Sequence, residues 1–252
     1  MSNAPQLSIV IPAYNEATYI DRLLEALSRQ NFKDFEVIVS DAQSKDKTPR
    51  VVESFKSKVD VKLVLSPPKG PGAGRNEGAK LASGQWLLFL DADIDINDPD
   101  FIKTLIQGAE QRGWQTATAR FKPLDGKLIE KIGFGFINYH YIKLMSLVGR
   151  PGAPGYCILT RRDLFESLRG FNENIKFGED YEYVDRASQK GFGFVDSTCY
   201  FVDQRRARQE GGLRLFWKGT LNEIYRQLFG YKKLEKNSIK YEFGKHGPRG
   251  RH

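Results

Sequence analysis

The sequence of 252 residues contains little cysteine and little histidine, with two Cys, Cys157 and Cys199, and three His. The two cysteines lie far apart, and neither belongs to a CxxC pair or to a Cys/His cluster. Zinc sites and disulfide frameworks depend on such spacings, so the sequence excludes a zinc-binding module and a disulfide-stapled scaffold. We expect both cysteines to be buried free thiols.

Long uninterrupted hydrophobic runs are also missing. The apolar run at residues 7–11 is short, stops at Pro12 and follows no basic segment, so it does not fit a secretion signal. The aromatic stretch 127–149 is interrupted by Lys131, His140 and Lys143, which argues against a transmembrane span. We expect a cytoplasmic protein without a membrane-spanning helix.

The net charge of +8 is concentrated in one segment. Residues 205–252 hold 13 Lys and Arg against 4 Asp and Glu, whereas basic and acidic residues nearly balance in the first 204. No RRM, zinc-finger or helix-turn-helix signature accompanies this basic segment, so we expect no nucleic-acid partner. A basic segment also suits anionic lipid head groups, and together with the aromatic residues of 132–148 it predicts peripheral contact with an anionic membrane.

Strand and helix patterns alternate four times in the first 100 residues. Short apolar runs that end at turn-forming residues predict strands, and apolar residues at helical spacing predict the helices between them. The predicted strands lie within residues 7–11, 37–41, 61–66 and 85–93. The predicted helices lie within 17–30, 46–57 and 70–83, and the last of these stretches begins as a glycine-rich turn that runs into the helix. This rhythm is typical of an α/β fold with a mostly parallel central sheet and helices on both faces.

The alternation loosens after residue 98. We expect a helix capped by Asp98 with Pro99 at its first position, because proline is favoured there. Further along, the pattern predicts a strand at 116–121, then a strand, a short helix and a turn within 152–173. It also predicts a helix opened by acidic residues within 177–191 and a last strand or strand pair at 192–202. The basic segment 205–252 is predicted to be a helical extension that ends in a tail.

Three alternating aspartates, Asp91, Asp93 and Asp95, follow the fourth predicted strand. A calcium loop would need Gly at the sixth position and Glu at the twelfth, where this sequence has Ile96 and Ile102. A purely structural turn is an open alternative, although Asp98 already serves as the predicted helix cap. The third interpretation is a divalent cation, because Mg²⁺ and Mn²⁺ bind few protein carboxylates together with phosphate oxygens. Ligands of open parallel sheets bind at this edge, beyond the carboxyl ends of the strands.

Four motifs, in this order, resemble those of family 2 glycosyltransferases, which are inverting enzymes of the GT-A fold. They are IVIPAYNE at 9–16, SDAQSKDKT at 40–48, GAGRNEGAKLASGQWLLFLDAD at 72–93 and GFNENIKFGEDYEYVDRASQKGF at 170–192. The resemblance spans about residues 7–205. It implies a single Rossmann-like domain at 1–204, with a nucleotide-binding half at about 7–98 and an acceptor half at about 99–204.

The resemblance also implies which residues bind the donor, a nucleoside-diphosphate sugar. The loop after the first strand would form the wall around the base and ribose, through Pro12, Ala13, Tyr14 and Glu16. Asp41 matches the aspartate that reads the base edge. Many members carry a second Asp next to it, where this sequence has Ala42. The resemblance favours UDP over GDP.

The remaining residues that match the family's motifs have charged side chains. Arg75 resembles the arginine near the base and diphosphate. Asp93 is the implied direct ligand of Mn²⁺ or Mg²⁺, and Asp91 would contact the ribose or the cation's water. Asp180 matches the general base that takes the proton from the acceptor hydroxyl, and Glu179 would face the acceptor or activate the base. A purely structural alternative to catalysis is that Glu179 and Asp180 are acidic residues at the start of a helix, where the helix dipole favours them.

Differences from the motifs of other phosphate-binding proteins and of processive family members narrow the predicted reaction. The glycines at 70, 72, 74 and 78 fit neither a P-loop nor GxGxxG. The Q-x-x-R-W motif of processive members is absent, so we expect transfer of a single sugar to a saccharide or lipid-linked acceptor. Arg205 and Arg206 are candidates for diphosphate binding, with solvated surface as the alternative. A nucleotidyltransferase and a non-catalytic nucleotide-sugar-binding relative are the other functional classes that stay open.

Overall fold

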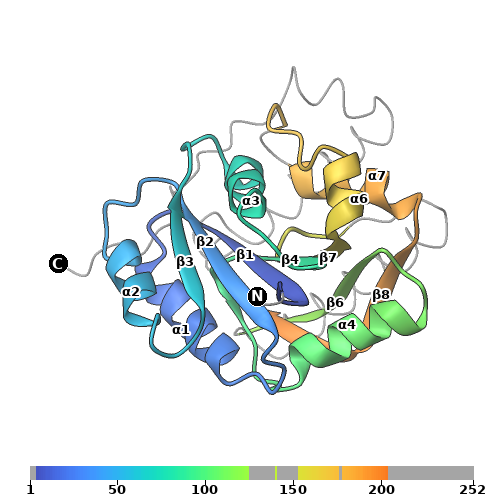
Figure 1. Ribbon diagram of the computed structural model, residues 1–252, viewed down its shortest axis with the longest axis horizontal. Coiled ribbons are helices and arrows are strands. Elements are labelled where there is room, and N and C mark those ends of the chain that lie inside the picture. The colour runs from blue at the N-terminus through green and yellow to red at the C-terminus, as the bar shows by residue number, and fades with distance from the viewer. Residues whose placement is uncertain (1–3, 125–139, 141–152, 176–177, 204–252) are drawn as a thin grey trace.

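A computed structural model describes residues 4–124, 140, 153–175 and 178–203. These residues form one eight-stranded sheet in the order β3-β2-β1-β4-β7-β6-β8-β5, with helices on both faces (Figure 1). The strands are β1 (Leu7–Ala13), β2 (Phe35–Asp41), β3 (Val61–Leu65), β4 (Trp86–Leu90), β5 (Ile94–Asp95), β6 (Thr116–Pro123), β7 (Cys157–Arg161) and β8 (Phe192–Val202). The helices are α1 (Ala17–Ser28), α2 (Thr48–Ser54), α3 (Pro71–Ala79), α4 (Phe101–Gln111), α6 (Arg162–Ser167) and α7 (Glu179–Ser188).

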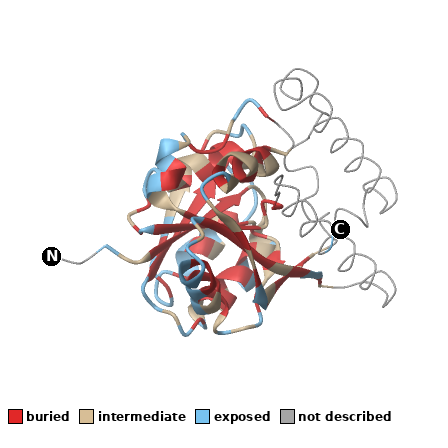
Figure 2. Ribbon diagram, turned by 90° about the vertical axis from the view of Figure 1, so that its right-hand side faces the viewer, coloured by how far each residue is buried: buried red, intermediate tan, exposed pale blue. Residues whose placement is uncertain are grey.

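Two apolar layers hold the helices against the sheet. Side chains alternate along a strand, so β1 sends Leu7, Ile9 and Ile11 to one face and Val10 to the other. The first face packs against α1, α2 and α4, and the second face packs against α6 and α7. Figure 2 shows the resulting buried sheet between its two helical layers. The predicted α/β fold with helices on both faces of a central sheet is therefore confirmed. Its central strands are buried on both faces, which explains why they read as continuous apolar runs in the sequence.

The first half of the sheet is parallel, and the second half is mixed. The pairs β1–β2, β1–β4, β2–β3 and β6–β8 run parallel. Strand β7 runs antiparallel to both β4 and β6, and β5 runs antiparallel to β8. The alternating strand–helix rhythm stops where β7 enters, which is why the later sequence lacks it.

Helix α3 lies unusually close to the sheet because it contains glycine. The sequence predicts a glycine-rich turn before this helix, but the structure starts the helix at Pro71, so Gly72, Gly74 and Gly78 lie inside it. A Cβ atom at Gly78 would stand 2.5 Å from Cγ1 of Val10 on β1. This close approach brings the side chains of α3 down to the level of the strand ends.

The structure corrects several local predictions made from the sequence. Helix α4 begins at Phe101 rather than Pro99. Asp98 does not cap it through its side chain; its Oδ1 accepts the backbone N–H of Asp100, and its Oδ2 accepts the Thr198 hydroxyl. The last segment is one strand, β8, with an irregular register against β6. Both cysteines are free, but only Cys157 is buried and Cys199 is partly exposed.

Most of the residues that we predict to contact a membrane lie in parts of the chain that the structure does not describe. The aromatic stretch 132–148, apart from His140, and the basic segment 205–252 lie outside the described residues. Among the helices that are described, none is long and apolar enough to cross a membrane. Peripheral association through residues 205–252 stays a prediction.

The buried carboxylate of Glu36 links β1, β2 and β3 near the amino ends of these strands. Glu36 on β2 is 1% exposed, and its Oε1 accepts hydrogen bonds from the Ser8 hydroxyl at 2.7 Å and from the Ser83 N–H and hydroxyl at 2.8 and 2.6 Å. Its Oε2 pairs with Lys62 Nζ at 2.7 Å. Burial opposes ionisation, but these donors outweigh it and lower the pKa of Glu36 to about 2.

We expect Glu36→Gln to reduce the free energy of unfolding at pH 7 by about 2–3 kcal/mol, because an amide leaves buried donors and Lys62 poorly paired. A carboxyl whose pKa is lower in the folded state stabilises above its unfolded value of 4.5. That contribution is lost as the pH falls toward 2, so the difference between variant and wild type should shrink. Urea unfolding at pH 7 and pH 3 measures both effects. Glu53→Gln, at a half-exposed surface pair, is the control, and equal stability of Glu36→Gln and wild type at pH 7 would contradict the prediction.

Candidate functional site

The candidate site lies at the carboxyl ends of β1, β2, β3 and β4. The parallel register places Ala13 beside Asp41 and Asp41 beside Leu65, so the ends of three strands meet at one edge. Pro12 and Ala13 are buried within β1, and Tyr14 and Glu16 follow it half-buried. The predicted nucleotide wall therefore borders Asp41, as the motif order requires.

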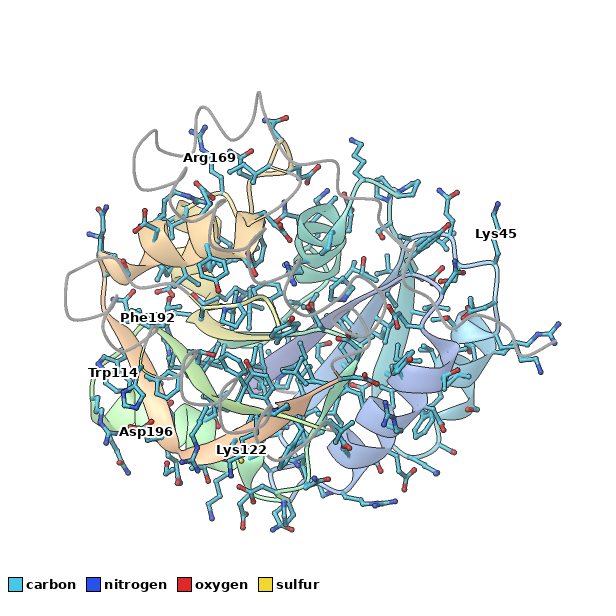
Figure 3. The ribbon with its side chains drawn as sticks, turned by 180° about the vertical axis from the view of Figure 1, so that it is seen from behind. Lys45, Trp114, Lys122, Arg169, Phe192 and Asp196 are labelled. Atoms are coloured by element: carbon cyan, nitrogen blue, oxygen red, sulfur yellow. The ribbon has the colours of Figure 1, made fainter. Side chains whose placement is uncertain are left out.

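The loop after β1 is tied to the loop after β2 by reciprocal hydrogen bonds. Asn15, at φ 56°, donates its N–H to the Ser44 hydroxyl and accepts the Lys45 N–H, both at 2.8 Å. Glu16 donates its N–H to the Thr48 hydroxyl at 2.8 Å, and that hydroxyl donates to Asp46. Lys45 itself points outward from this loop (Figure 3). Sequence reasoning missed Ser44, Asp46 and Thr48 as supports of the wall.

Asp41 presents an unsatisfied carboxylate oxygen. The side chain is 1% exposed, and its Oδ2 accepts the Ser44 N–H at 2.9 Å. Its Oδ1 has no hydrogen-bond partner, and neither do the nearby buried hydroxyls of Ser40 and Ser66. Buried polar atoms in folded proteins are nearly always paired, so this group of acceptors and hydroxyls indicates a place where a ligand supplies the missing bonds.

Asp91 and Asp93 follow β4 and remain partly exposed. Oδ1 of Asp91 accepts a hydrogen bond from Arg75 Nη2 at 2.7 Å, and 26% of its side chain is open to solvent. Within the described ranges, no three Asp, Glu, His or Cys side chains converge to form a complete metal cage. Two carboxylates at a strand end nevertheless fit Mg²⁺ or Mn²⁺, because these ions fill their coordination with substrate phosphates and water.

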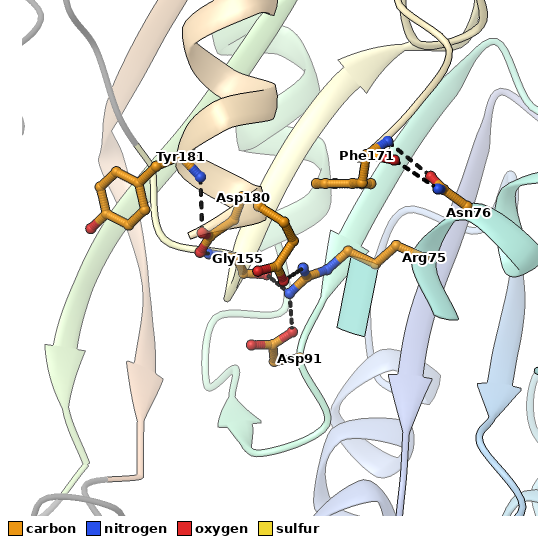
Figure 4. A network of polar contacts seen from close by, with 8 residues as sticks. Arg75, Asn76, Asp91, Gly155, Phe171, Asp180 and Tyr181 are labelled. Carbon is orange, nitrogen blue, oxygen red and sulfur yellow. Dashed lines mark hydrogen bonds and ion pairs between the residues drawn. The ribbon is translucent and has the colours of Figure 1, made fainter. Parts of the chain in front are cut away.

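Arg75 is the buried centre of the charged cluster, because its side chain is only 2% exposed. Its Nη1 donates to Glu179 Oε1 at 3.0 Å, and its Nη2 donates to Asp91 and to the carbonyl oxygen of Gly155 at 3.2 Å (Figure 4). Burial alone would lower the pKa of Arg75, but the surrounding carboxylates outweigh it and raise that pKa. The permanent positive charge thus faces protein groups, whereas the sequence match places it near the base and diphosphate.

Glu179 and Asp180 open helix α7, where the helix dipole favours acids. Gly178 precedes them in the left-handed region at φ 87°, which turns the chain into the helix. Asp180 is half-buried; its Oδ2 accepts the Gly155 N–H and its Oδ1 accepts the Tyr181 N–H. Burial raises the pKa of both carboxyls, and proximity to Asp180 raises that of Glu179 further, while Arg75 opposes both shifts.

Three further residues support this cluster, Gly155, Phe171 and Asn76, and sequence reasoning gave none of them a role. Gly155 joins Arg75 to Asp180 through its two peptide groups. Phe171 places its ring 5.3 Å from the Arg75 guanidinium carbon, and the amide of Asn76 exchanges two hydrogen bonds of 2.9 Å with the Phe171 backbone (Figure 4). The structure thus brings Arg75, Asp91, Glu179 and Asp180 together, while Arg205 and Arg206 lie outside the described residues.

A sequence model of the family described as Glycosyl transferase family 2 matches residues 8–169, which is more than half of the chain. The chain belongs to glycosyl transferase family 2. It is 34% identical, over 92% of its length and 74% of the relative's, to the GalNAc(5)-diNAcBac-PP-undecaprenol beta-1,3-glucosyltransferase of Campylobacter jejuni. It is 33% identical to the amylovoran biosynthesis glycosyltransferase AmsB of Erwinia amylovora, over 89% of this chain and 81% of that one.

Other relatives of this family 2 member are longer. The validoxylamine A glucosyltransferase of Streptomyces hygroscopicus is 40% identical over 109 residues, which are 42% of this chain and 26% of that protein. The structure of Staphylococcus aureus TarS 1-349 in complex with UDP-GlcNAc matches with a TM-score of 0.64 and 24% identity, over 79% of this chain and 58% of that one. The Pyrobaculum calidifontis mannosyltransferase PcManGT, solved with GDP-Man and Mn²⁺, matches with a TM-score of 0.66 and 20% identity, over 79% and 57%. These likenesses establish the GT-A fold.

Proposed function

We propose that the protein transfers one sugar from a nucleoside-diphosphate sugar to an acceptor hydroxyl, with inversion at the anomeric carbon. The observation that supports this most directly is the joining of Asp91 and Asp180 through Arg75 and Gly155. Asp91 belongs to the strand ends where a nucleotide binds, and Asp180 opens a helix on the other side. One site thus holds a donor-side carboxylate and a carboxylate suited to accept a proton.

The donor base is proposed to bind at Asp41. Its free Oδ1 is an acceptor that suits a ring N–H, which both uracil and guanine possess. Tyr14, Glu16, Pro12 and Ala13 would form the wall beside the base and ribose. We favour UDP because TarS is solved with UDP and with UDP-GlcNAc, and GDP is the rival because PcManGT is solved with GDP-Man.

Asp93, with Asp91 beside it, would hold Mn²⁺ or Mg²⁺ together with the donor's diphosphate. The ion would neutralise the negative charge that develops on the leaving diphosphate. The resemblance to the family's DxD pair leads us to assign Asp93 as the direct ligand, while Asp91 also accepts a hydrogen bond from Arg75. The presence of Mn²⁺ in the PcManGT structure supports the choice of metal.

Asp180 is proposed as the general base. Its carboxylate accepts the proton of the acceptor hydroxyl while that oxygen bonds to the anomeric carbon, and the bond from this carbon to the diphosphate oxygen breaks with its electron pair leaving on the diphosphate. One displacement inverts the sugar's configuration and leaves the proton on Asp180. Burial raises the pKa of this carboxyl, which makes the carboxylate a stronger base than an ordinary aspartate.

The acceptor side is assigned to residues 99–204, with 205–252 as an extension. A lipid-linked acceptor is supported by the C. jejuni relative, whose name includes an undecaprenol-linked saccharide, and a free saccharide is the alternative. Arg205 and Arg206 remain candidates for holding a diphosphate. The proposed functions of the two halves rest on the motif order, with Asp41 at the end of β2 and Asp180 in the first turn of α7.

The test of the proposed function is thermal unfolding of the protein with UDP, GDP, CDP or dTDP, each with and without Mn²⁺. We expect UDP with Mn²⁺ to raise Tm. Asp41→Asn should weaken UDP binding by roughly 10- to 100-fold, because an amide that keeps its oxygen on Ser44 turns an N–H toward the base N–H.

Asp60→Asn, at an exposed position before β3, is the matched control. If no diphosphate stabilises the wild type, the proposed transfer from a nucleoside-diphosphate sugar is contradicted. Release of pyrophosphate from a nucleoside triphosphate would instead identify a nucleotidyltransferase.

A further inference from the structure

Arg75 has little surface with which to meet a nucleotide. Its guanidinium is 2% exposed, and its two terminal nitrogens donate to Glu179, Asp91 and Gly155. The Phe171 ring lies 5.3 Å from the guanidinium carbon. A donor phosphate would have to displace these groups before it could bind the arginine.

The groups that Arg75 joins belong to the two sides of the site. Asp91 ends the β4 segment on the donor side, whereas Glu179 begins α7. The peptide groups of Gly155 extend the connection, because its carbonyl oxygen accepts from Arg75 and its N–H donates to Asp180. A continuous path of short polar contacts therefore runs from Asp91 through Arg75 and Gly155 to Asp180 (Figure 4).

The groups along this path are closely packed at two glycines, Gly155 and Gly72. A Cβ atom at Gly155 would collide with Arg75 Nη2, stand 2.9 Å from the guanidinium carbon and 3.1 Å from Asp180 Oδ2. A Cβ atom at Gly72 on α3 would stand 3.0 Å from Cγ of Glu179. Two glycines thus let the helix α3, the loop before β7 and the start of α7 approach one another around the guanidinium.

We propose that Arg75 is a positioning residue that fixes the separation between the donor-side carboxylate Asp91 and the general base Asp180, acting through the Gly155 peptide and not by binding the donor. This inference rests on the proposed function. The planar guanidinium suits the task because it holds several acceptors at fixed angles, which an ammonium group does not. Precise separation matters because a misplacement of about 1 Å at a reacting centre can cost about 100-fold in rate.

The test compares Arg75→Lys with wild type for two quantities, the Kd of UDP with Mn²⁺ and the kcat for release of UDP from a UDP-sugar, with water or a saccharide as acceptor. We expect kcat to fall about 100-fold and the nucleotide Kd to stay within about threefold. A donor-binding arginine predicts the opposite pattern. If the wild type neither binds nucleotide nor turns over, the proposed function fails and not this inference alone.

Glu179→Gln provides a second variant that keeps the shape of the site and is expected to fold. It should also lower kcat while leaving the nucleotide Kd within about threefold. Arg186→Lys is the control, because Arg186 on α7 also donates to a carboxylate, Glu182, and to backbone carbonyl oxygens, those of Leu168 and Gly170. Its kcat should match wild type. A tenfold or larger loss of nucleotide affinity in Arg75→Lys, or an unchanged kcat in both Arg75→Lys and Glu179→Gln, would overturn the proposal.

Discussion

Asp180→Asn is expected to lower kcat by about 1,000-fold while the Kd of UDP with Mn²⁺ stays within about twofold. General-base catalysis contributes roughly 100- to 10,000-fold, and an amide cannot accept the proton of the acceptor hydroxyl. The amide oxygen can still accept the N–H of Gly155 or Tyr181, so the start of α7 should keep its place. Nucleotide binding, which we propose for the strand ends, should therefore survive.

The measurement is steady-state turnover together with calorimetric titration of the nucleotide. Asp163→Asn makes the same chemical change at an exposed residue of α6 and should leave both quantities unchanged. Turnover above one-tenth of wild type in Asp180→Asn would remove Asp180 from the role of general base. A simultaneous collapse of nucleotide affinity would indicate instead that the substitution disturbs the fold of the site.

The pH dependence of turnover follows from the same carboxyl. Burial raises the pKa of Asp180, so its proton-accepting form is lost at a higher pH than that of an ordinary aspartate. Activity governed by this group should fall on the acidic side as the pH drops.

Local sequence patterns predict the strand ends well. Each strand of the parallel half is a short apolar run, and the acids that follow it can be placed because parallel strands end at the same edge of the sheet. Asp41 and Asp91 lie where that argument puts them. The signal at Asp180 is weaker, since acids at a helix start are common for dipole reasons alone, and here the order of the motifs supplied the prediction.

The remainder of the site depends on contacts between residues far apart in the chain. Arg75 and Glu179 are separated by 104 residues, so no local pattern shows that they pair. Gly155 is needed because a Cβ atom at this position would collide with Arg75, and only the folded geometry reveals this. The same limit applies to α3, whose glycines suggest a turn locally but permit close packing against Val10 in the fold. Tertiary packing overrides the local preference of glycine in these cases.

Asp93→Ala should abolish the stabilisation that UDP gives only in the presence of Mn²⁺. A ligand at about 100 times its Kd stabilises a protein by about 2.7 kcal/mol, which corresponds to a Tm rise of about 5–10 °C for a domain of this size. Without the direct carboxylate ligand, the ion and the diphosphate no longer hold each other at the strand end. The Tm rise with UDP and Mn²⁺ should then shrink to that of UDP alone.

Asp95→Ala is the decisive control, because Asp95 is the third of the alternating aspartates and lies on β5, two residues beyond Asp93. A metal site defined by Asp91 and Asp93 leaves this variant with the full Mn²⁺-dependent rise in Tm. If negative charge at the strand end merely attracts cations, both alanine variants should lose a similar part of that rise. Equal losses would therefore sink the assignment of Asp93 as a ligand, whereas loss in Asp93→Ala alone separates coordination from general electrostatic attraction.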